Sequence, residues 1–216
     1  MNWIYERWKF LRHLEVSNSK ARCIVAKDVW SSWGNDAKFS LYEGQVNIGY
    51  PFPHLPQRAT YNKSVVAVAN RGLIEVHGNL WIAPGTYIHV CEGAKLIFRG
   101  NNFIAHNTTI IVGNHVEFGK HVSTGWNCTF IDYDRRQFYS SEGKALKREA
   151  RALVFEDYSG VQMNVVIPQG VRVGERAVIG ANTVVRQDVP AGCLVYQNPE
   201  LKVKKNVTPG LHLSKS

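Results

Sequence analysis

The chain has 216 residues, 44% of them hydrophobic, and a formal net charge of +9. This length and composition suffice for one sizeable core, so we expect one main domain. Glu6 and Arg7 precede any long apolar run, and no window approaches the roughly 18 apolar residues that a membrane span needs. The sequence therefore predicts a soluble, cytoplasmic protein.

The positive charge indicates an anionic partner, which could be a nucleic acid, a membrane surface, an acidic glycan or the phosphates of a cofactor. Nucleic acid is disfavoured because the basic residues are scattered and the sequence has no recognised nucleic-acid module. The four cysteines lie far apart, without a CxxC pair or a histidine at zinc-finger spacing: Cys23, Cys91, Cys128 and Cys193. We expect reduced thiols and no metal site.

Residues 1–60 are predicted to form an N-terminal cap and an irregular segment. Residues 1–16 fit a short amphipathic helix, whose apolar side carries Ile4, Trp8, Leu11 and Trp3. Such a helix would cover the open edge of the fold, and weak association with a membrane surface is the alternative. Residues 17–60 look irregular, and the stretch PFPHLPQR holds too many prolines for a central strand.

Residues 61–205 follow a period of six. The C-terminal third divides into FEDYSG, VQMNVV, IPQGVR, VGERAV, IGANTV and VRQDVP, each of which begins with an apolar residue: Phe155, Val161, Ile167, Val173, Ile179 and Val185. Upstream the same period gives FGKHVS, TGWNCT and FIDYDR, with Thr124 at one first position. Between Ile110 and Glu117 the period slips by two, which a wider corner can absorb.

A period of six fits neither an amphipathic helix nor a sandwich strand. It predicts an all-β solenoid of short parallel strands, in which three hexads make one triangular coil and the first positions form the core. An ordinary β-sandwich with coincidental spacing is the alternative. A loop at about 137–153 interrupts the coils, and residues 206–216 form a C-terminal tail.

Three segments resemble the hexapeptide-repeat acyltransferases, most closely the branch that acetylates sugars in capsule and O-antigen synthesis. They are FGKHVSTGWNCTFIDYD (118–134), QFYSSEGKALKREARALVFED (137–157) and IGANTVVRQDVPAGCLVYQNPELKVKK (179–205). The resemblance implies a left-handed parallel β-helix that assembles as a homotrimer. It also implies a sugar, nucleotide-sugar or glycan as the acceptor of the acetyl group.

The resemblance implies that acetyl-CoA, the acyl donor, lies in the groove between neighbouring subunits. On this chain that points to a set of donor-binding residues: Asn164, Gly180, Ala181, Asn182, Lys202 and Lys204. The two lysines belong to the basic tail and would meet the nucleotide phosphates. Where the family usually has Asn-Pro-Ala-Lys, this chain has Asn198-Pro199-Glu200-Leu201, so the lysine moves to 202.

The catalytic base of the resembling enzymes is a histidine in an Asp-x-Asp-x-His pattern. This chain has Asp132-Tyr133-Asp134-Arg135-Arg136 at that place, so the expected histidine is Arg136. A guanidinium has no acceptor nitrogen and stays protonated, so Arg136 cannot serve as the base. A second departure is Gly160-Val161-Gln162, where the family often has Trp-Ile-Gly.

Three interpretations of the charged segment Asp132-Tyr133-Asp134-Arg135-Arg136 remain open. Another group could act as the base: Asp132, Asp134 or a histidine, with His121 best placed and His106 and His115 as alternatives. The chain could instead bind ligand without turnover, or the cluster could be a solvated turn of ion pairs. In an acceptor site, the sugar-binding residues would be Trp126, Asn127 and Arg136.

We therefore expect an acyl-CoA-dependent acetyltransferase that acts on a sugar hydroxyl or amine in glycan synthesis. The competing hypothesis is a catalytically silent hexapeptide-repeat protein that binds a glycan or organises a biosynthetic complex. Arg136 and the Gly160-Val161-Gln162 departure favour the silent protein, whereas the intact IGAN coil and the basic tail favour the enzyme.

Overall fold

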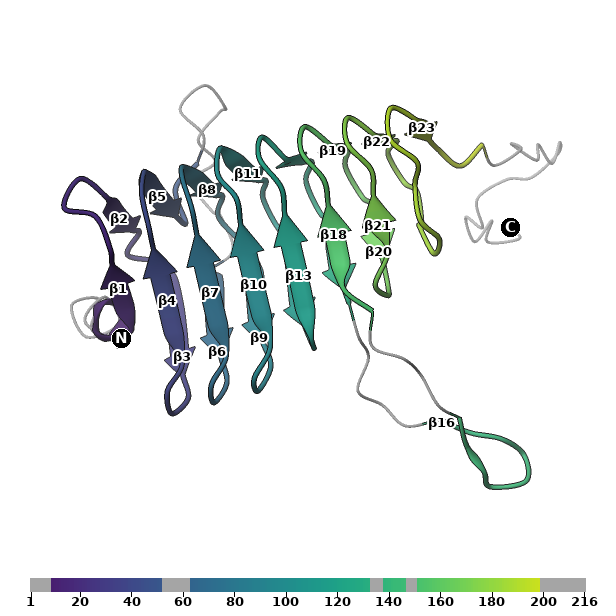
Figure 1. The fold of residues 1–216 in the computed structure, drawn as a ribbon, viewed down its shortest axis with the longest axis horizontal. Coiled ribbons are helices and arrows are strands. Elements are labelled where there is room, and N and C mark those ends of the chain that lie inside the picture. The colour runs from purple at the N-terminus through teal and green to yellow at the C-terminus, as the bar shows by residue number, and fades with distance from the viewer. Residues whose placement is uncertain (1–8, 52–62, 133–137, 147–150, 199–216) are drawn as a thin grey trace, which may run out of the picture.

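The computed structural model describes residues 9–51, 63–132, 138–146 and 151–198. Three parallel sheets run along the molecule and form the sides of a triangular prism, and the chain visits them in the fixed order A, B, C (Figure 1). In Figure 1 the strands of sheet A run upward at the front, and the chain crosses over the top to sheet B while it advances from left to right. This path is a left-handed parallel β-helix, as predicted, and it excludes the β-sandwich alternative.

Each coil from β1 (Leu14–Val16) to β15 (Thr129–Ile131) contributes one short strand to each sheet, whereas the last described coil contributes only β23 (Leu194–Val195). Sheet A consists of β1 (Leu14–Val16), β4 (Lys38–Leu41), β7 (Leu73–Val76), β10 (Lys95–Phe98), β13 (His115–Phe118), β18 (Leu153–Phe155) and β21 (Arg172–Val173). Sheet B consists of β2 (Arg22–Val25), β5 (Gln45–Ile48), β8 (Leu80–Ile82), β11 (Asn102–Ile104), β14 (Ser123–Thr124), β19 (Gly160–Val161), β22 (Val178–Ile179) and β23 (Leu194–Val195). Sheet C consists of β3 (Val29–Trp33), β6 (Ser64–Val68), β9 (Tyr87–Val90), β12 (Thr109–Val112), β15 (Thr129–Ile131) and β20 (Val166–Ile167).

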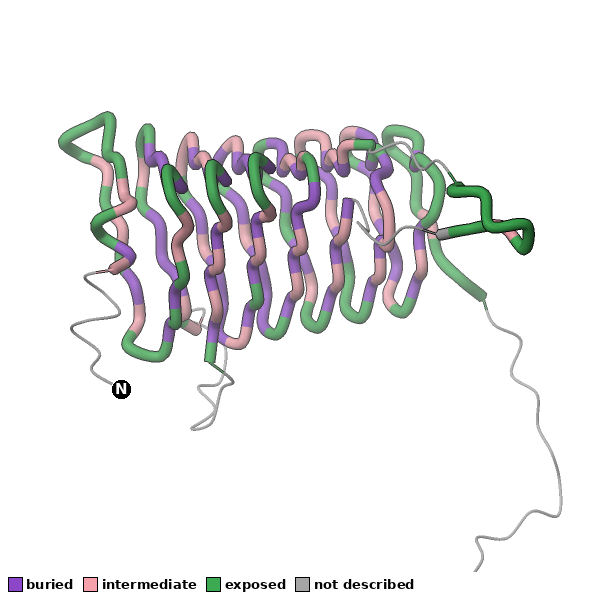
Figure 2. Tube along the Cα trace, turned by 90° about the horizontal axis from the view of Figure 1, so that it is seen from below, coloured by how far each residue is buried: buried purple, intermediate pink, exposed green. Residues whose placement is uncertain are grey.

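The core fills the inside of the prism. Buried positions alternate with partly exposed ones along the strands, because successive side chains of a strand point to opposite faces (Figure 2). All six apolar first positions of the C-terminal hexads are buried, which confirms the predicted core: Phe155, Val161, Ile167, Val173, Ile179 and Val185. Phe118 stacks between Phe98 and Phe155, with ring centroids 5.0 Å and 4.8 Å apart.

The β-helix begins earlier than the sequence analysis places it. Residues 17–60 were expected to be irregular, yet β2 pairs with β5, β1 with β4, and β3 with β6. Residues 9–12 are helical, but the helix expected over residues 1–16 does not reach its predicted end, because Leu14–Val16 form β1. Residues 1–8, the first half of that expected helix, lie outside the described residues, as do 52–62. The early strands escape detection because corners of unequal length hide the period of six, and parallel pairing between coils has no local signal.

The slip in the period is absorbed by a tighter corner, not the wider one that the sequence analysis expects. Between β12 and β13 only Gly113 and Asn114 turn the chain, whereas four residues separate β9 from β10 at the same edge. Between β15 and β18 the chain forms an antiparallel hairpin of β16 (Phe138–Tyr139) and β17 (Ala145–Leu146). No helix within the described part of the chain is long and apolar enough to cross a membrane.

Candidate functional site

The predicted site residues lie on three different edges of the prism. Six predicted binding residues follow strands of sheet B and line the edge between sheets B and C: Trp126, Asn127, Asn164, Gly180, Ala181 and Asn182. His121 lies on the edge between sheets A and B, and Asp132 on the edge between sheets C and A. Strands of three or four residues at about 3.3 Å per residue keep these edges roughly 10 Å or more apart. Asp134, Arg136, Lys202 and Lys204 lie outside the described residues.

The edge between sheets B and C carries a ladder of asparagines. Asn127, Asn164 and Asn182 all have left-handed backbone conformations, with φ of 57°, 57° and 59°. Asparagine tolerates this conformation better than most residues. The Asn127 amide donates to Asn164 Oδ1 at 3.3 Å, and the Asn164 amide donates to Asn182 Oδ1 at 3.0 Å. These residues therefore hold successive coils in register, whatever ligand the edge binds.

Close packing shapes the same edge around Gly180. A Cβ atom built on Gly180 would lie 2.8 Å from the Cβ atom of Tyr196 in the next coil, so a side chain there would force the coils apart. The preceding corner has Gln162 at the equivalent position, and its Oε1 accepts the Ala181 N–H at 3.1 Å. The departure from the Trp-Ile-Gly pattern thus places a side-chain amide over a backbone donor of the predicted donor-binding edge.

Cys128 lies at this edge but is a poor nucleophile. Burial raises the pKa of its thiol, against backbone hydrogen bonds that lower it, so the protonated form is favoured. The thiol donates to the Gln162 carbonyl, 3.2 Å away. A buried, protonated thiol with an acceptor is a structural group.

His121 belongs to a stack of side chains on the edge between sheets A and B. Its ring lies 4.8 Å from the Tyr158 ring with an interplanar angle of 5°, and the Arg176 guanidinium lies 5.1 Å from the Tyr158 ring centre. All three residues have left-handed backbones, with φ between 55° and 60°. His121 is exposed, and its Nε2 faces the Asn101 amide nitrogen at 3.4 Å.

Asp132 caps the two-residue corner between β12 and β13. Its carboxylate is 2% exposed and accepts the N–H groups of Gly113 at 2.6 Å, Asn114 at 2.8 Å and His115. A corner two residues shorter than its neighbours exposes backbone donors that need an acceptor. Asp132 supplies it, and a carboxylate committed to three donors is poorly placed to take a proton from a substrate.

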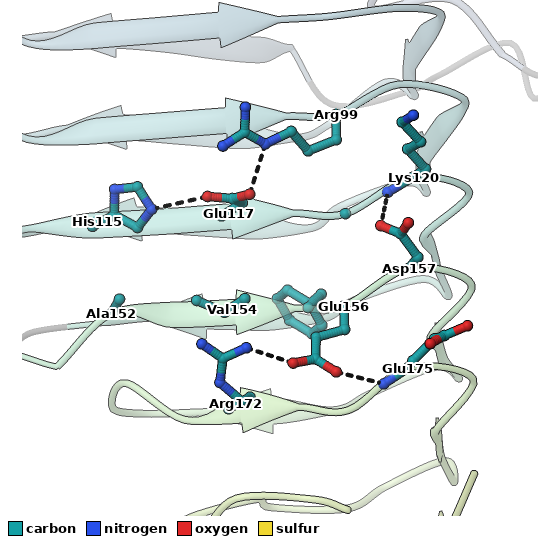
Figure 3. Close-up of a pocket in the computed structure, with 12 residues that line it drawn as sticks. Arg99, His115, Glu117, Lys120, Ala152, Val154, Glu156, Asp157, Arg172 and Glu175 are labelled. Carbon is teal, nitrogen blue, oxygen red and sulfur yellow. Dashed lines mark hydrogen bonds and ion pairs between the residues drawn. The ribbon is translucent and has the colours of Figure 1, made fainter. Parts of the chain in front are cut away.

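A groove of about 660 Å³ runs across the outer face of sheet A, between β13 and β18 (Figure 3). Its residues come from β10 to β21 and the corners beyond them: Arg99, His115, Glu117, Gly119, Lys120, Ala152, Val154, Phe155, Glu156, Asp157, Arg172 and Glu175. The hollow forms because Val154 and Ala152 are short, whereas the neighbouring coils present the long side chains of Glu117 and Arg172.

Two ion-pair networks form the sides of the groove. On one side, Glu117 accepts the Arg99 Nε–H at 2.7 Å and lies 3.3 Å from His115 Nε2. Burial opposes the ionisation of Glu117, but its hydrogen bonds to Arg99 and His115 hold its pKa below the ordinary value. On the other side, the Glu156 carboxylate pairs with Arg172 and accepts the Glu175 N–H at 2.9 Å.

Sequence reasoning missed most of this groove. Arg99, Glu117, Glu156 and Arg172 were not singled out, and His115 was named only as an alternative base. The segment HVEF carries a usable signal, because residues two apart on a strand share a face, so His115 and Glu117 had to lie side by side. The pairing of Glu117 with Arg99, and of Glu156 with Arg172, depends on stacking between coils and has no local signal.

No protein-family model matches this chain. The galactoside O-acetyltransferase of Lactococcus lactis is 27% identical over 138 residues, which cover 61% of this chain and 62% of that protein. A 2,3,4,5-tetrahydropyridine-2,6-dicarboxylate N-acetyltransferase of Staphylococcus aureus is 41% identical over 56 residues, 26% of this chain and 23% of that protein. The chain thus spans less than two thirds of the length of either relative.

Two solved structures also resemble the chain at low identity. The polySia specific acetyltransferase NeuO is 20% identical with a TM-score of 0.43, covering 94% of this chain and 90% of that one. The polysialic acid O-acetyltransferase OatWY is 17% identical with a TM-score of 0.38, covering 94% of each chain.

Proposed function

We propose that this protein is an acetyltransferase that moves the acetyl group of acetyl-CoA to a hydroxyl or amine of a sugar. One observation carries the proposal: 138 residues of a left-handed β-helix align with a galactoside O-acetyltransferase. The acceptor would be a sugar, nucleotide-sugar or glycan of capsule, O-antigen or related synthesis. The reaction would take place in the cytoplasm, where acyl-CoA is available.

The donor would bind along the edge between sheets B and C. Asn164, Gly180, Ala181 and Asn182 offer backbone and amide groups there, and Lys202 and Lys204 of the tail would meet the phosphates. Three exposed apolar side chains follow the same edge and suit a long, partly apolar ligand: Trp126, Met163 and Tyr196.

The active form would be a homotrimer. The outward positions of sheet C in the described strands carry no Asp, Glu, Lys or Arg: Trp30, Ser32, Val65, Ala67, Tyr87, His89, Thr109, Ile111, Thr129, Ile131 and Val166. Such a face suits burial against another copy. The predicted donor-binding and catalytic residues lie on different edges of one chain, so they could meet only across an interface. Assembly would provide this by bringing an edge of one chain against a face of its neighbour.

The predicted acceptor and base residues divide into four groups. Trp126 and Asn127 lie on the edge proposed for the donor and could contact the acceptor there, whereas Arg136 and Asp134 lie outside the described residues. Asp132 is occupied by the corner that it caps. Among the predicted catalytic residues in the described ranges, His121 is the one with an exposed proton acceptor.

Thiol release tests the proposal directly. Native protein with acetyl-CoA and a panel of galactosides, nucleotide-sugars and oligosaccharides should release CoA only when an acceptor is present. Isothermal titration with CoA should show binding that is weakened in Ala181→Trp, which fills the proposed donor edge without a side chain at Gly180. Absence of both release and binding would refute the proposal.

A silent binding protein is the second candidate, and Gln162 favours it. The Gln162 side chain occupies the Ala181 N–H on the proposed donor edge, and Arg136 replaces the histidine of the resembling enzymes. This candidate predicts no thiol release from the native protein and release from Arg136→His, with or without Gln162→Gly. Release from the native protein would exclude it.

A further inference from the structure

We propose that the groove on sheet A binds a neutral sugar acceptor and that His115, positioned by Glu117 and Arg99, is the base that deprotonates its hydroxyl. The inference rests on the proposed acetyltransferase function and names the acceptor site and the base for it. It assigns the base to His115 of β13, since the chain has arginine at 136.

The His115 ring is oriented by a chain of two interactions. Its Nε2 lies 3.3 Å from Glu117 Oε2, and the other oxygen of Glu117 accepts the Arg99 Nε–H at 2.7 Å (Figure 3). Because Glu117 is held in its charged form, it can only accept, so Nε2 must carry the proton. In the neutral imidazole the other nitrogen, Nδ1, is then an acceptor with a lone pair, which is what a general base needs.

The backbone beneath His115 is held in place. Asp132 accepts the His115 N–H, and β13 is paired in register with β10 on one side and β18 on the other. The His115 side chain is 28% exposed, so it is partly enclosed but reaches the groove. A base positioned on a strand with fixed neighbours is more precisely oriented than one on a loop.

The groove itself fits an uncharged polyhydroxyl ligand. Its lining contains three permanent cations against four carboxylates, so it is nearly neutral although the protein carries a net charge of +9. Val154 and Ala152 give an apolar floor for a sugar ring, and the guanidinium and carboxylate groups at the sides can donate to and accept from hydroxyls. A polyanionic ligand would meet the four carboxylates.

His121 lacks this arrangement. Its ring is stacked on Tyr158 at an exposed edge, and its Nε2 faces the Asn101 amide, with no carboxylate among its described partners. The Asn101 amide nitrogen can only donate, so this contact engages Nε2 as an acceptor and leaves the proton on Nδ1. His115 is thus the better oriented of the two histidines.

The chain also contains a matched pair outside the groove. His77 Nε2 lies 3.3 Å from Glu75 Oε2, and the His77 side chain is 29% exposed, both nearly the same as at His115. His77 differs in being stacked on Tyr42, with ring centres 4.3 Å apart, and it does not line the groove. If the pair alone sufficed, both histidines would matter equally; if the groove is the acceptor site, only His115 should.

The proposed step is a direct acyl transfer. His115 Nδ1 takes the proton of the acceptor hydroxyl while the hydroxyl oxygen attacks the thioester carbonyl carbon of acetyl-CoA, which would be held by the edge between sheets B and C of a neighbouring copy in the proposed trimer. The new carbon–oxygen bond forms, the carbon–sulfur bond breaks, and the imidazolium returns its proton to the departing thiolate. The products are the acetylated sugar and CoA, so atoms and charge balance.

Substitution of the two histidines tests the assignment. His115→Ala and His115→Gln should lower kcat/KM for thiol release with a galactoside by about 100- to 10,000-fold, whereas His77→Ala should stay within about twofold of native. Free imidazole should restore part of the activity of His115→Ala, which it could not do for a variant that is merely misfolded. Thermal unfolding of all variants would confirm that they fold.

Glu117 and the groove floor provide the remaining readouts. Glu117→Gln should lower kcat with little change in KM, and Glu117→Asp should recover part of the loss, because Glu117 positions the ring. Val154→Trp should raise KM for the galactoside but leave CoA binding unchanged, and an oligosialic acid should be the poorer acceptor. Activity that survives His115→Gln, or lost activity that imidazole fails to restore, overturns the base assignment alone. Absence of thiol release from native protein overturns the acetyltransferase proposal and the base assignment with it, whereas CoA binding would then support the silent protein.

Discussion

The outer faces of sheets A and C cover the same hydrophobic core but carry different kinds of side chain. Sheet A presents charged side chains and a groove, with Glu117 and Arg172 on either side of the short Val154. The described strands of sheet C present an uncharged face of side chains such as Tyr87 and Ile111. Each strand buries one row of residues and leaves the other row free, so the repeat constrains the inside and not the outside. The inward row accounts for the fold, and the outward rows account for the difference between the charged, grooved face of sheet A and the uncharged face of sheet C.

The largest effect should come from the core that both faces share. Phe118→Ala should lower the free energy of unfolding by about 3–5 kcal/mol, because Phe118 is fully buried between two stacked rings. Chemical denaturation measures the change, and Tyr139→Ala in the exposed hairpin should shift it by less than about 0.5 kcal/mol. A loss below about 1 kcal/mol for Phe118→Ala would contradict the tight packing of Phe118 between Phe98 and Phe155.

The corner that leads into the grooved face should be the next most sensitive. Asp132→Ala should cost about 3 kcal/mol, because three backbone donors would lose a charged acceptor. Asp157→Ala, which removes the acceptor of the Lys120 N–H at an exposed corner, is the matched control and should cost about 1 kcal/mol. Equal losses in the two variants would contradict the special role of the two-residue corner.

The uncharged face can be tested by placing a charge on it. Ile111→Lys should convert the proposed trimer into monomers, because a buried lysine without a partner strongly disfavours an interface. Lys95→Glu changes a charge on the outer face of sheet A and should leave the oligomeric state unchanged. Light scattering coupled to size-exclusion chromatography gives the mass of each. A monomeric native protein, or a trimeric Ile111→Lys, would argue against sheet C as the interface.

The smallest effect concerns the pH dependence of stability at the groove. The pKa of Glu117 is below its ordinary value because its bonds to Arg99 and His115 outweigh its burial. A depressed carboxyl pKa adds stability above the ordinary value of 4.5, and this stability is lost as the pH falls through the lower, folded-state pKa. Glu117→Gln should therefore be less stable than native at pH 7 by up to about 1 kcal/mol, and this difference should shrink as the pH falls from 4.5 through the folded-state pKa of Glu117. A difference in unfolding free energy between native protein and Glu117→Gln that stays constant from pH 7 down to pH 3 would contradict this prediction.

Much of the fold follows from the sequence because its signal is local and repeated. The hexads from Phe155 to Val185 place an apolar residue at each first position, and all of these positions are buried. The early coils do not show the period, and the pairing of β1 to β5 with later strands was missed for that reason. The slip near Gly113 was found, but its direction was wrong, because corner length depends on a cap that comes from Asp132, 19 residues away.

The residues of the candidate site likewise divide into those that a single segment reveals and those that depend on contacts between coils. His121, Trp126 and Asn127 could be named from a single segment, yet the structure places His121 on a different edge from the other two. The association of Arg99 with Glu117, and the hollow over Val154, depend on which residues of successive coils stack.

The period of six was enough to predict a β-helix and the residues that fill its core, because inward positions recur along the chain. Which outward side chains meet could be known only from the folded chain, because that depends on the register between coils whose lengths vary. Asp132 and Glu117 illustrate the difference. Asp132 looked catalytic in its own segment and caps a corner, whereas Glu117 drew no attention and orients the histidine of a groove. A side chain's role depends on its neighbours in the adjacent coils, and those neighbours are about 20 residues away in the chain.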